Sequence, residues 1–148
     1  MNTGTIANKV EPGKPIPQKF TCQGEGVSPP LSFHDIPDKT ESLVLIVDDP
    51  DAPSGTFDHW IAWNIPAETQ TLTEGTQLLK QQGKNSYGKK GYKGPCPPPG
   101  NAHRYFFKLY ALDEILSLPL DAGKKQVESA MEGHILVMAE LIGTYQRH

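Results

Sequence analysis

The apolar positions of this chain fall mostly into short runs separated by glycine and proline. The segment 42–47 is continuously apolar and largely β-branched, and it ends in acidic residues and proline, which is typical of a buried strand. A second run covers 58–65 and stops at Pro66, and a long aromatic run covers 102–112. Shorter candidate strands are 31–33 and 76–80.

Only one segment has clear helical spacing. Apolar residues recur along one face of 124–132, and Gly133 follows where a left-handed C-terminal cap belongs. The final segment, 134–145, is ambiguous because its centre suits a helix and its end suits a strand; we choose the strand. Strands joined by proline-rich connections, with one or two short helices, predict a mainly β protein with an antiparallel sandwich.

Length and charge narrow the function classes. The 148 residues suit one domain spanning 1–148, and 14 Lys and Arg stand against 17 Asp and Glu without a basic block. We therefore expect no nucleic-acid partner. No apolar stretch approaches the roughly 20 residues of a membrane-spanning helix, so we expect no membrane insertion. The first residues lack secretory signal features, which makes a cytoplasmic location the default expectation.

The two cysteines, Cys22 and Cys96, do not form a disulfide framework by their number or spacing. We interpret them as one small buried apolar residue and one loop residue. A Cys22–Cys96 bridge is the less favoured alternative, because the sequence gives no information on their separation in space.

Titratable residues gather at the ends of the predicted strands. The motif 48–53, Asp-Asp-Pro-Asp-Ala-Pro, follows the first long strand, and the motif 94–100, Gly-Pro-Cys-Pro-Pro-Pro-Gly, precedes the third. The second motif closes the apolar-poor segment 81–100, and loops of this length are often functional. Prolines lower the entropy of an unfolded loop and restrict its shape. This arrangement predicts a rigid site for a small anion.

Strand alternation indicates which side chains face that site. Residues two apart share a face, so His103 and Tyr105 point one way and Arg104 points the other. By the same rule, His59 is expected to lie on the face of its strand that carries Ile61 and Trp63.

These side chains suggest how an anion would be held. Two imidazoles and a phenol supply hydrogen-bond donors. Asp49 extends one apolar face of the first strand; it can fix a histidine tautomer and raise the pKa of that ring, or share a proton with a phosphate oxygen. The absence of an arginine fork predicts modest affinity. Taken singly, each of these residues is also common as a structural element, so the site depends on their meeting in space.

The motifs resemble the phosphatidylethanolamine-binding protein family, which includes the Raf kinase inhibitor proteins and short bacterial and archaeal relatives. The resemblance covers nearly the whole chain, through Asp49-Pro50-Asp51-Ala52-Pro53, His59-Trp60, Gly94-Pro95 and His103-Arg104-Tyr105, with the opening 20–31 and the ending 132–145. It implies an antiparallel β-sandwich with Greek-key connections. The residues that would line or shape the anion site are Asp49, Asp51, Pro53, His59, Gly94, Pro95, His103 and Tyr105. The chain ends at His148 without the C-terminal helix of eukaryotic members, so we do not expect regulation that depends on that helix.

The leading hypothesis is a non-enzymatic binding protein for small anions such as phosphate or phosphoethanolamine-like head groups, with no cofactor and no metal. The resemblance also implies a protein partner, a kinase or a serine protease. An alternative is a metal-dependent hydrolase in which Asp49, His59 and His103 form a facial triad for Fe or Zn, although these residues lack a recognisable ligand spacing. A third reading is a self-associating protein such as a homodimer.

Overall fold

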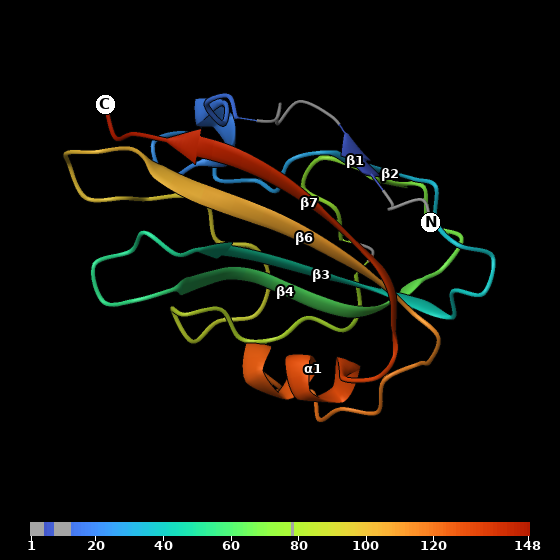
Figure 1. Ribbon diagram of the computed structural model, residues 1–148. Coiled ribbons are helices and arrows are strands. Elements are labelled where there is room, and N and C mark those ends of the chain that lie inside the picture. Colours follow the sequence, from blue (N-terminus) through green and yellow to red (C-terminus); the bar gives the residue numbers. More distant parts are fainter. Residues whose placement is uncertain (1–4, 8–12, 78) are drawn as a thin grey trace.

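The protein, in a computed structural model that describes residues 5–7, 13–77 and 79–148, consists of two antiparallel sheets and one α-helix (Figure 1). The larger sheet has the order β4-β3-β6-β7 and the smaller has the order β1-β2-β5. The larger sheet comprises β3 (Ser42–Asp49), β4 (Phe57–Pro66), β6 (His103–Leu112) and β7 (Ile135–Tyr145). The smaller comprises β1 (Thr5–Ala7), β2 (Leu31–His34) and β5 (Thr71–Leu72), and the helical elements are η1 (Gln18–Phe20) and α1 (Lys124–Met131).

The chain path confirms the predicted antiparallel sandwich. After the β3–β4 hairpin the chain crosses to the smaller sheet, where β5 pairs with β2. It then returns to pair β6 with the free side of β3, and β7 completes the edge beside β6. This crossing between sheets is the type of connection that the Greek-key expectation requires.

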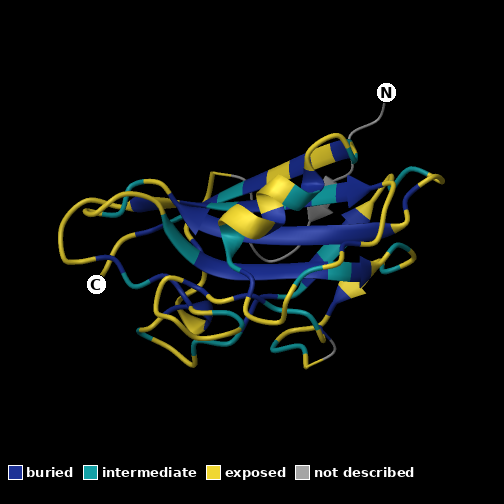
Figure 2. Ribbon diagram, turned by 90° about the horizontal axis from the view of Figure 1, so that it is seen from below, coloured by how far each residue is buried: buried dark blue, intermediate teal, exposed yellow. Residues whose placement is uncertain are grey.

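The larger sheet is covered on both faces, which explains why every residue of β3 is buried (Figure 2). Leu43, Leu45 and Val47 pack toward the smaller sheet in one apolar cluster. Val44 and Ile46 pack on the other face, in a second cluster that includes residues of α1. No described helix is both long enough and apolar enough to span a bilayer.

Most of the predicted elements are confirmed, with ends shifted by one or two residues. The segment 134–145 is a strand, α1 ends at Met131, and Gly133 has the left-handed φ of 80°. The predicted strand 76–80 is wrong at its described positions, 76, 77, 79 and 80, and residue 78 lies outside the described residues. The strand that pairs with β2 is instead the two-residue β5.

The interpretation of the cysteines as two separate thiols is wrong. Cys22 and Cys96 form a disulfide, with their Cα atoms 5.3 Å apart across 74 residues of sequence. The two loops already lie together, because the Cys22 N–H donates a 3.1 Å hydrogen bond to the Pro95 carbonyl. The bridge therefore joins the proline-rich loop to the segment that follows η1.

Candidate functional site

A cavity of about 460 Å³ lies at one end of the larger sheet. The loop between β3 and β4 and the loop that precedes β6 both project at this end (Figure 1). The side chains that line the cavity include five of the residues expected to form the anion site: Asp49, Pro53, His59, His103 and Tyr105. The structure therefore brings residues of the β3–β4 hairpin together with residues of β6, which lies far from that hairpin in the sequence.

Asp49 and His103 form a buried pair in the wall of this cavity. The Asp49 Oδ2 atom lies 2.7 Å from the His103 Nδ1 atom, and the two residues are only 3% and 9% exposed. The Asp51 N–H donates a 2.7 Å bond to the other carboxylate oxygen of Asp49. Because an ionised carboxylate only accepts, the His103 proton resides on Nδ1 and Nε2 is the ring nitrogen left for a ligand.

His59 has the same tautomer for a different reason. Its Nδ1 atom lies 2.6 Å from the Lys93 carbonyl oxygen, and a carbonyl can only accept, so Nδ1 carries the proton. Burial lowers the pKa of His59, against the opposing effects of the Lys93 hydrogen bond and of nearby carboxylates. The neutral ring is therefore favoured, and it offers an Nε2 lone pair.

This pairing corrects the expectation that the neutral imidazoles act as donors. With both Nδ1 atoms engaged, each neutral ring presents an acceptor at Nε2, and it can donate there only after protonation. The histidines consequently suit an oxyacid that still carries a proton, or an anion that arrives together with a proton.

The position of His59 also corrects the expected strand alternation. Val47 pairs with Trp60 and Asp48 pairs with Asp58, so His59 is an extra residue in β4, a β-bulge. The bulge places His59 on the same side of the sheet as Trp60. The His59 ring packs against Tyr105, with 5.3 Å between centroids, whereas Ile61 and Trp63 face the opposite cluster that contains α1.

Tyr105 supplies the unpartnered polar group of the cavity. The residue is 1% exposed, and its hydroxyl has no hydrogen-bond partner of normal geometry among the described residues. Burial raises the pKa of this hydroxyl, and the neighbouring Asp49 charge raises it further. Tyr105 therefore stays a neutral donor. Buried hydroxyls nearly always find a partner, so this hydroxyl is a donor that a group bound in the cavity could engage.

Asp51 lies outside the cavity and anchors its rim. Its carboxylate accepts two hydrogen bonds from the Arg104 guanidinium, at 2.8 and 2.9 Å, and a third from the Arg104 backbone N–H at 2.9 Å. These hydrogen bonds lower the pKa of Asp51 to about 2. Arg104 points away from the cavity, as alternation along β6 predicts.

Gly94 and Pro95 also lie behind the cavity wall. A Cβ atom on Gly94 would collide with the Phe20 carbonyl and lie 3.0 Å from the Thr21 Cα. Only glycine therefore allows the loop to lie flat against the segment after η1. The Pro95 carbonyl accepts the Cys22 N–H at the same contact.

Sequence reasoning missed the aromatic mouth of the cavity. Phe57 contacts His59 and Tyr87, with ring centroids 4.8 Å apart in each case, and the Lys93 Nζ lies 5.3 Å from the Tyr87 centroid. Phe57 could have been found, because it lies two residues before His59 in β4. Tyr87 lies in an irregular loop that carries no periodic signal.

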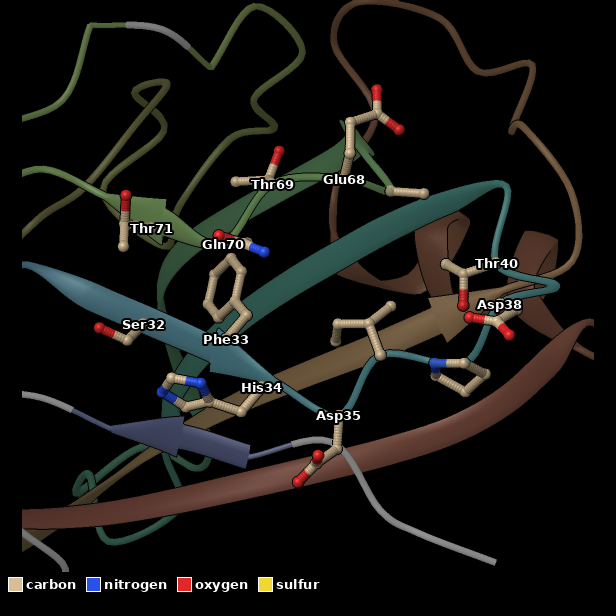
Figure 3. A pocket seen from close by; sticks show the side chains of 13 residues that line it. Ser32, Phe33, His34, Asp35, Asp38, Thr40, Glu68, Thr69, Gln70 and Thr71 are labelled. Carbon is tan, nitrogen blue, oxygen red and sulfur yellow. The ribbon is translucent and has the colours of Figure 1, made fainter.

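Two further observations bear on alternative sites. The described residues contain no group of three or more His, Cys, Asp or Glu side chains arranged to hold a metal ion. A second hollow of about 650 Å³ lies between the β2–β3 and β4–β5 loops. Figure 3 shows that the Asp35 and Glu68 side chains at its rim extend in opposite directions, so its acids do not converge on one point.

Comparisons with known proteins agree with this architecture. A model of the phosphatidylethanolamine-binding protein family matches residues 6–146. A UPF0098 protein of Pyrococcus horikoshii is 50% identical over 141 residues, covering 89% of this chain and 71% of the relative. A phosphatidylethanolamine-binding protein homologue from Chlamydia trachomatis superposes with a TM-score of 0.95 at 45% identity, covering 100% of both chains. The structure of E. coli YbcL, described as a member of the mammalian PEBP family, has a TM-score of 0.91 at 28% identity, covering 99% of this chain and 100% of YbcL. The chain therefore belongs to the phosphatidylethanolamine-binding protein family.

Proposed function

We propose that this protein binds a small phosphate-type oxyanion, either free phosphate or a phosphate monoester head group, in the cavity between β3, β4 and β6. The observation that carries the proposal is the Tyr105 hydroxyl, which is buried, has no hydrogen-bond partner of normal geometry among the described residues, and interacts with the Asp49 carboxylate strongly enough to raise its pKa. An oxyanion in the cavity would accept a hydrogen bond from it and remove the cost of leaving a buried donor unpaired.

The charges of the cavity favour an anion that carries its own proton. Asp49 is buried beside the site, so a fully ionised anion would be repelled. A phosphate monoester has a second pKa near 6, so at about pH 6 half of it carries one P–OH group beside its ionised oxygens, and inorganic phosphate keeps a P–OH group even as the dianion. The P–OH group can donate to a histidine Nε2 while an ionised oxygen accepts from Tyr105.

The aromatic mouth supports an organic substituent on that phosphate. Phe57 and Tyr87 stand edge to face at the entrance, and the Lys93 ammonium already lies over the Tyr87 ring. Aromatic faces attract ammonium groups. A head group such as phosphoethanolamine, which pairs a phosphate with an ammonium, therefore matches both the interior and the entrance.

Calorimetric titration with phosphate and phosphoethanolamine tests the proposal. Tyr105→Phe deletes only the hydroxyl, and we expect it to weaken binding about tenfold while leaving the free energy of unfolding unchanged or slightly raised. Tyr110→Phe, on the same strand but outside the cavity, is the matched control and should bind like the wild type. Absence of binding by the wild type, or equal affinity for all three proteins, would contradict the proposal.

The finer expectations about partners have less support. A kinase or serine protease partner, a homodimer and a cytoplasmic location stay predictions. The relatives named above carry no enzymatic name, and the hydrolase alternative has gained no supporting observation. A disulfide is unusual in a reducing cytoplasm, so in that compartment the Cys22–Cys96 bridge would have to resist cellular thiols or respond to them.

A further inference from the structure

We propose that the Cys22–Cys96 disulfide is a thiol–disulfide exchange site that controls the anion affinity of the cavity, so that reduction by a dithiol weakens binding. The affinity part of this inference rests on the proposed function. The structural part, which concerns the cavity wall, does not depend on it.

The bridge is both accessible and part of the cavity. Cys22 is exposed and Cys96 is half-buried, and Cys96 lines the cavity together with Pro97 and Pro98. A thiolate in solution can therefore approach the Cys22 sulfur from outside. The sulfur released on the other side of the bond belongs to the wall of the anion site.

The surroundings of Cys96 favour it as the leaving group. The Arg147 Nη1 atom lies 3.7 Å from the Cys96 sulfur, and a neighbouring guanidinium stabilises a thiolate. In the first step a dithiol thiolate bonds to the Cys22 sulfur, the Cys22–Cys96 bond breaks, and Cys96 leaves as a thiolate. In the second step the other thiol of the reagent, as thiolate, attacks the mixed disulfide and Cys22 leaves as a thiolate. The protein disulfide thus gains two electrons and two protons, and the dithiol becomes a disulfide.

Opening the bond would release one part of the loop and leave the rest in place. The part before Cys96 has other anchors: the Tyr92 hydroxyl donates to the Phe20 carbonyl at 2.7 Å, and Gly94 lies against the same backbone. Beyond Cys96, the hydrogen bonds to the loop among the described residues come from the exposed C-terminal residues. Arg147 donates to the Pro97 carbonyl at 3.5 Å, and Gln146 donates to the Gly100 carbonyl at 2.6 Å. The disulfide is thus the covalent anchor of the segment 96–100.

Linkage makes the proposal quantitative. A cavity wall that must be ordered on binding reduces affinity, and we expect the reduced protein to bind phosphate about tenfold more weakly. The coupling is reciprocal, so saturating phosphate should stabilise the oxidised form. A tenfold difference in affinity corresponds to a midpoint potential about 30 mV more negative in phosphate.

The experiment compares the oxidised protein, the dithiol-reduced protein and Cys22→Ser. Phosphate is titrated by calorimetry, and the midpoint potential is measured with and without phosphate. Protein labelled with ¹³C-proline reports on the wall directly: signals of Pro97, Pro98 and Pro99 should shift and sharpen on reduction, while those of Pro66 and Pro119 stay unchanged. Cys22→Ser lacks the bridge, so it should bind phosphate as weakly as the reduced protein does. Its affinity should not change when dithiol is added.

The role of Arg147 is tested by the rate of reduction. Arg147→Gln should be reduced several-fold more slowly by the same dithiol, because the departing thiolate loses its cation. Arg147→Lys, which keeps the charge, should be close to the wild type. If neither substitution changes the rate of reduction, Arg147 does not stabilise the Cys96 thiolate, and the assignment of Cys96 as the leaving group is contradicted.

The two proposals fail in different ways. Equal phosphate affinity in the oxidised and reduced forms, with unchanged proline signals, would overturn the exchange-site proposal and leave the anion site standing. Phosphate binding in neither form would overturn the proposed function and the affinity part together. The proline signals would then still decide whether the bridge controls the wall.

Discussion

The Nδ1 atom of His103 lies 2.7 Å from Oδ2 of Asp49, and both side chains are buried at the end of the same sheet. This pair fixes which nitrogen of the ring faces a ligand. It also places the Asp49 carboxylate directly behind the proposed anion site, so we expect that site to select its ligand by proton content as much as by charge.

Replacing Asp49 by Asn should expose the structural importance of the pair. One amide oxygen cannot accept from both the His103 ring and the Asp51 N–H, and the amide NH₂ would face one of these donors. We expect a loss of about 2 kcal/mol in the free energy of unfolding, measured by chemical denaturation. Asp113→Asn is the matched control, because it removes an exposed His134–Asp113 pair whose loss should cost under about 1 kcal/mol. Similar costs for both variants would contradict the assigned role.

The affinities of the cavity for sulfate and for phosphate should diverge as the pH rises. Sulfate carries no proton near neutrality, so it needs a protonated imidazole, whereas phosphate can donate its own proton to Nε2. The pKa of His59 is lowered by burial, which makes a protonated ring scarce at neutral pH. We expect calorimetry at about pH 8 to detect phosphate but not sulfate, with sulfate binding recovered as the pH is lowered. Parallel pH profiles for the two anions would refute this mode of recognition.

Burial of His59 should make the protein less stable in mild acid. The folded state binds a proton at His59 less readily than the unfolded state, whose pKa is the ordinary 6.5. The stability that the protein gains from a neutral, buried His59 is therefore fully present above pH 6.5. It is lost as the pH falls below 6.5 toward the lowered pKa of the folded state. Denaturation of the wild type and of His59→Gln across this range should show a steeper loss for the wild type. Equal slopes for the two proteins would contradict a buried, neutral His59 ring.

Gly94→Ala should destabilise the proline-rich loop through steric overlap alone. The added methyl group would overlap the Phe20 carbonyl, which belongs to backbone held by its own hydrogen bonds. We expect a loss of about 1–3 kcal/mol in the free energy of unfolding. Gly123→Ala, where no atom lies within 4 Å of the new Cβ, should cost less, under about 1 kcal/mol, because only the weaker helix capping of alanine is added at the start of α1. Equal effects at the two positions would show that the loop can move aside.

Sequence periodicity correctly predicted which face of the sheet each side chain occupies where the strands are regular. In β3 and β6, strict alternation separates Asp49, His103 and Tyr105 from Asp48 and Arg104, and the structure shows the same separation. Alternation failed in β4, because the bulge at His59 adds one residue without any compositional signal. Face assignments are therefore dependable only up to the first irregularity of a strand.

Features that depend on contact across the fold could not be read from the chain. The Cys22–Cys96 bridge spans 74 residues, and its formation depends on Gly94 lying against the segment after η1. The histidine tautomers depend on acceptors at Asp49 and Lys93 that no local pattern indicates. The disulfide and the tautomers are also the features that most change the expected chemistry of the site.

The extra residue at His59 divides β4 into two parts with different roles. From Trp60 onward, side chains serve the two apolar layers; Phe57 and His59, before that point, serve the cavity. Because the bulge separates the two regions, we expect a substitution at Phe57 to change the mouth of the cavity while the apolar layers beyond Trp60 keep their packing. Descendants of such a chain could diversify in what they recognise without having to refold.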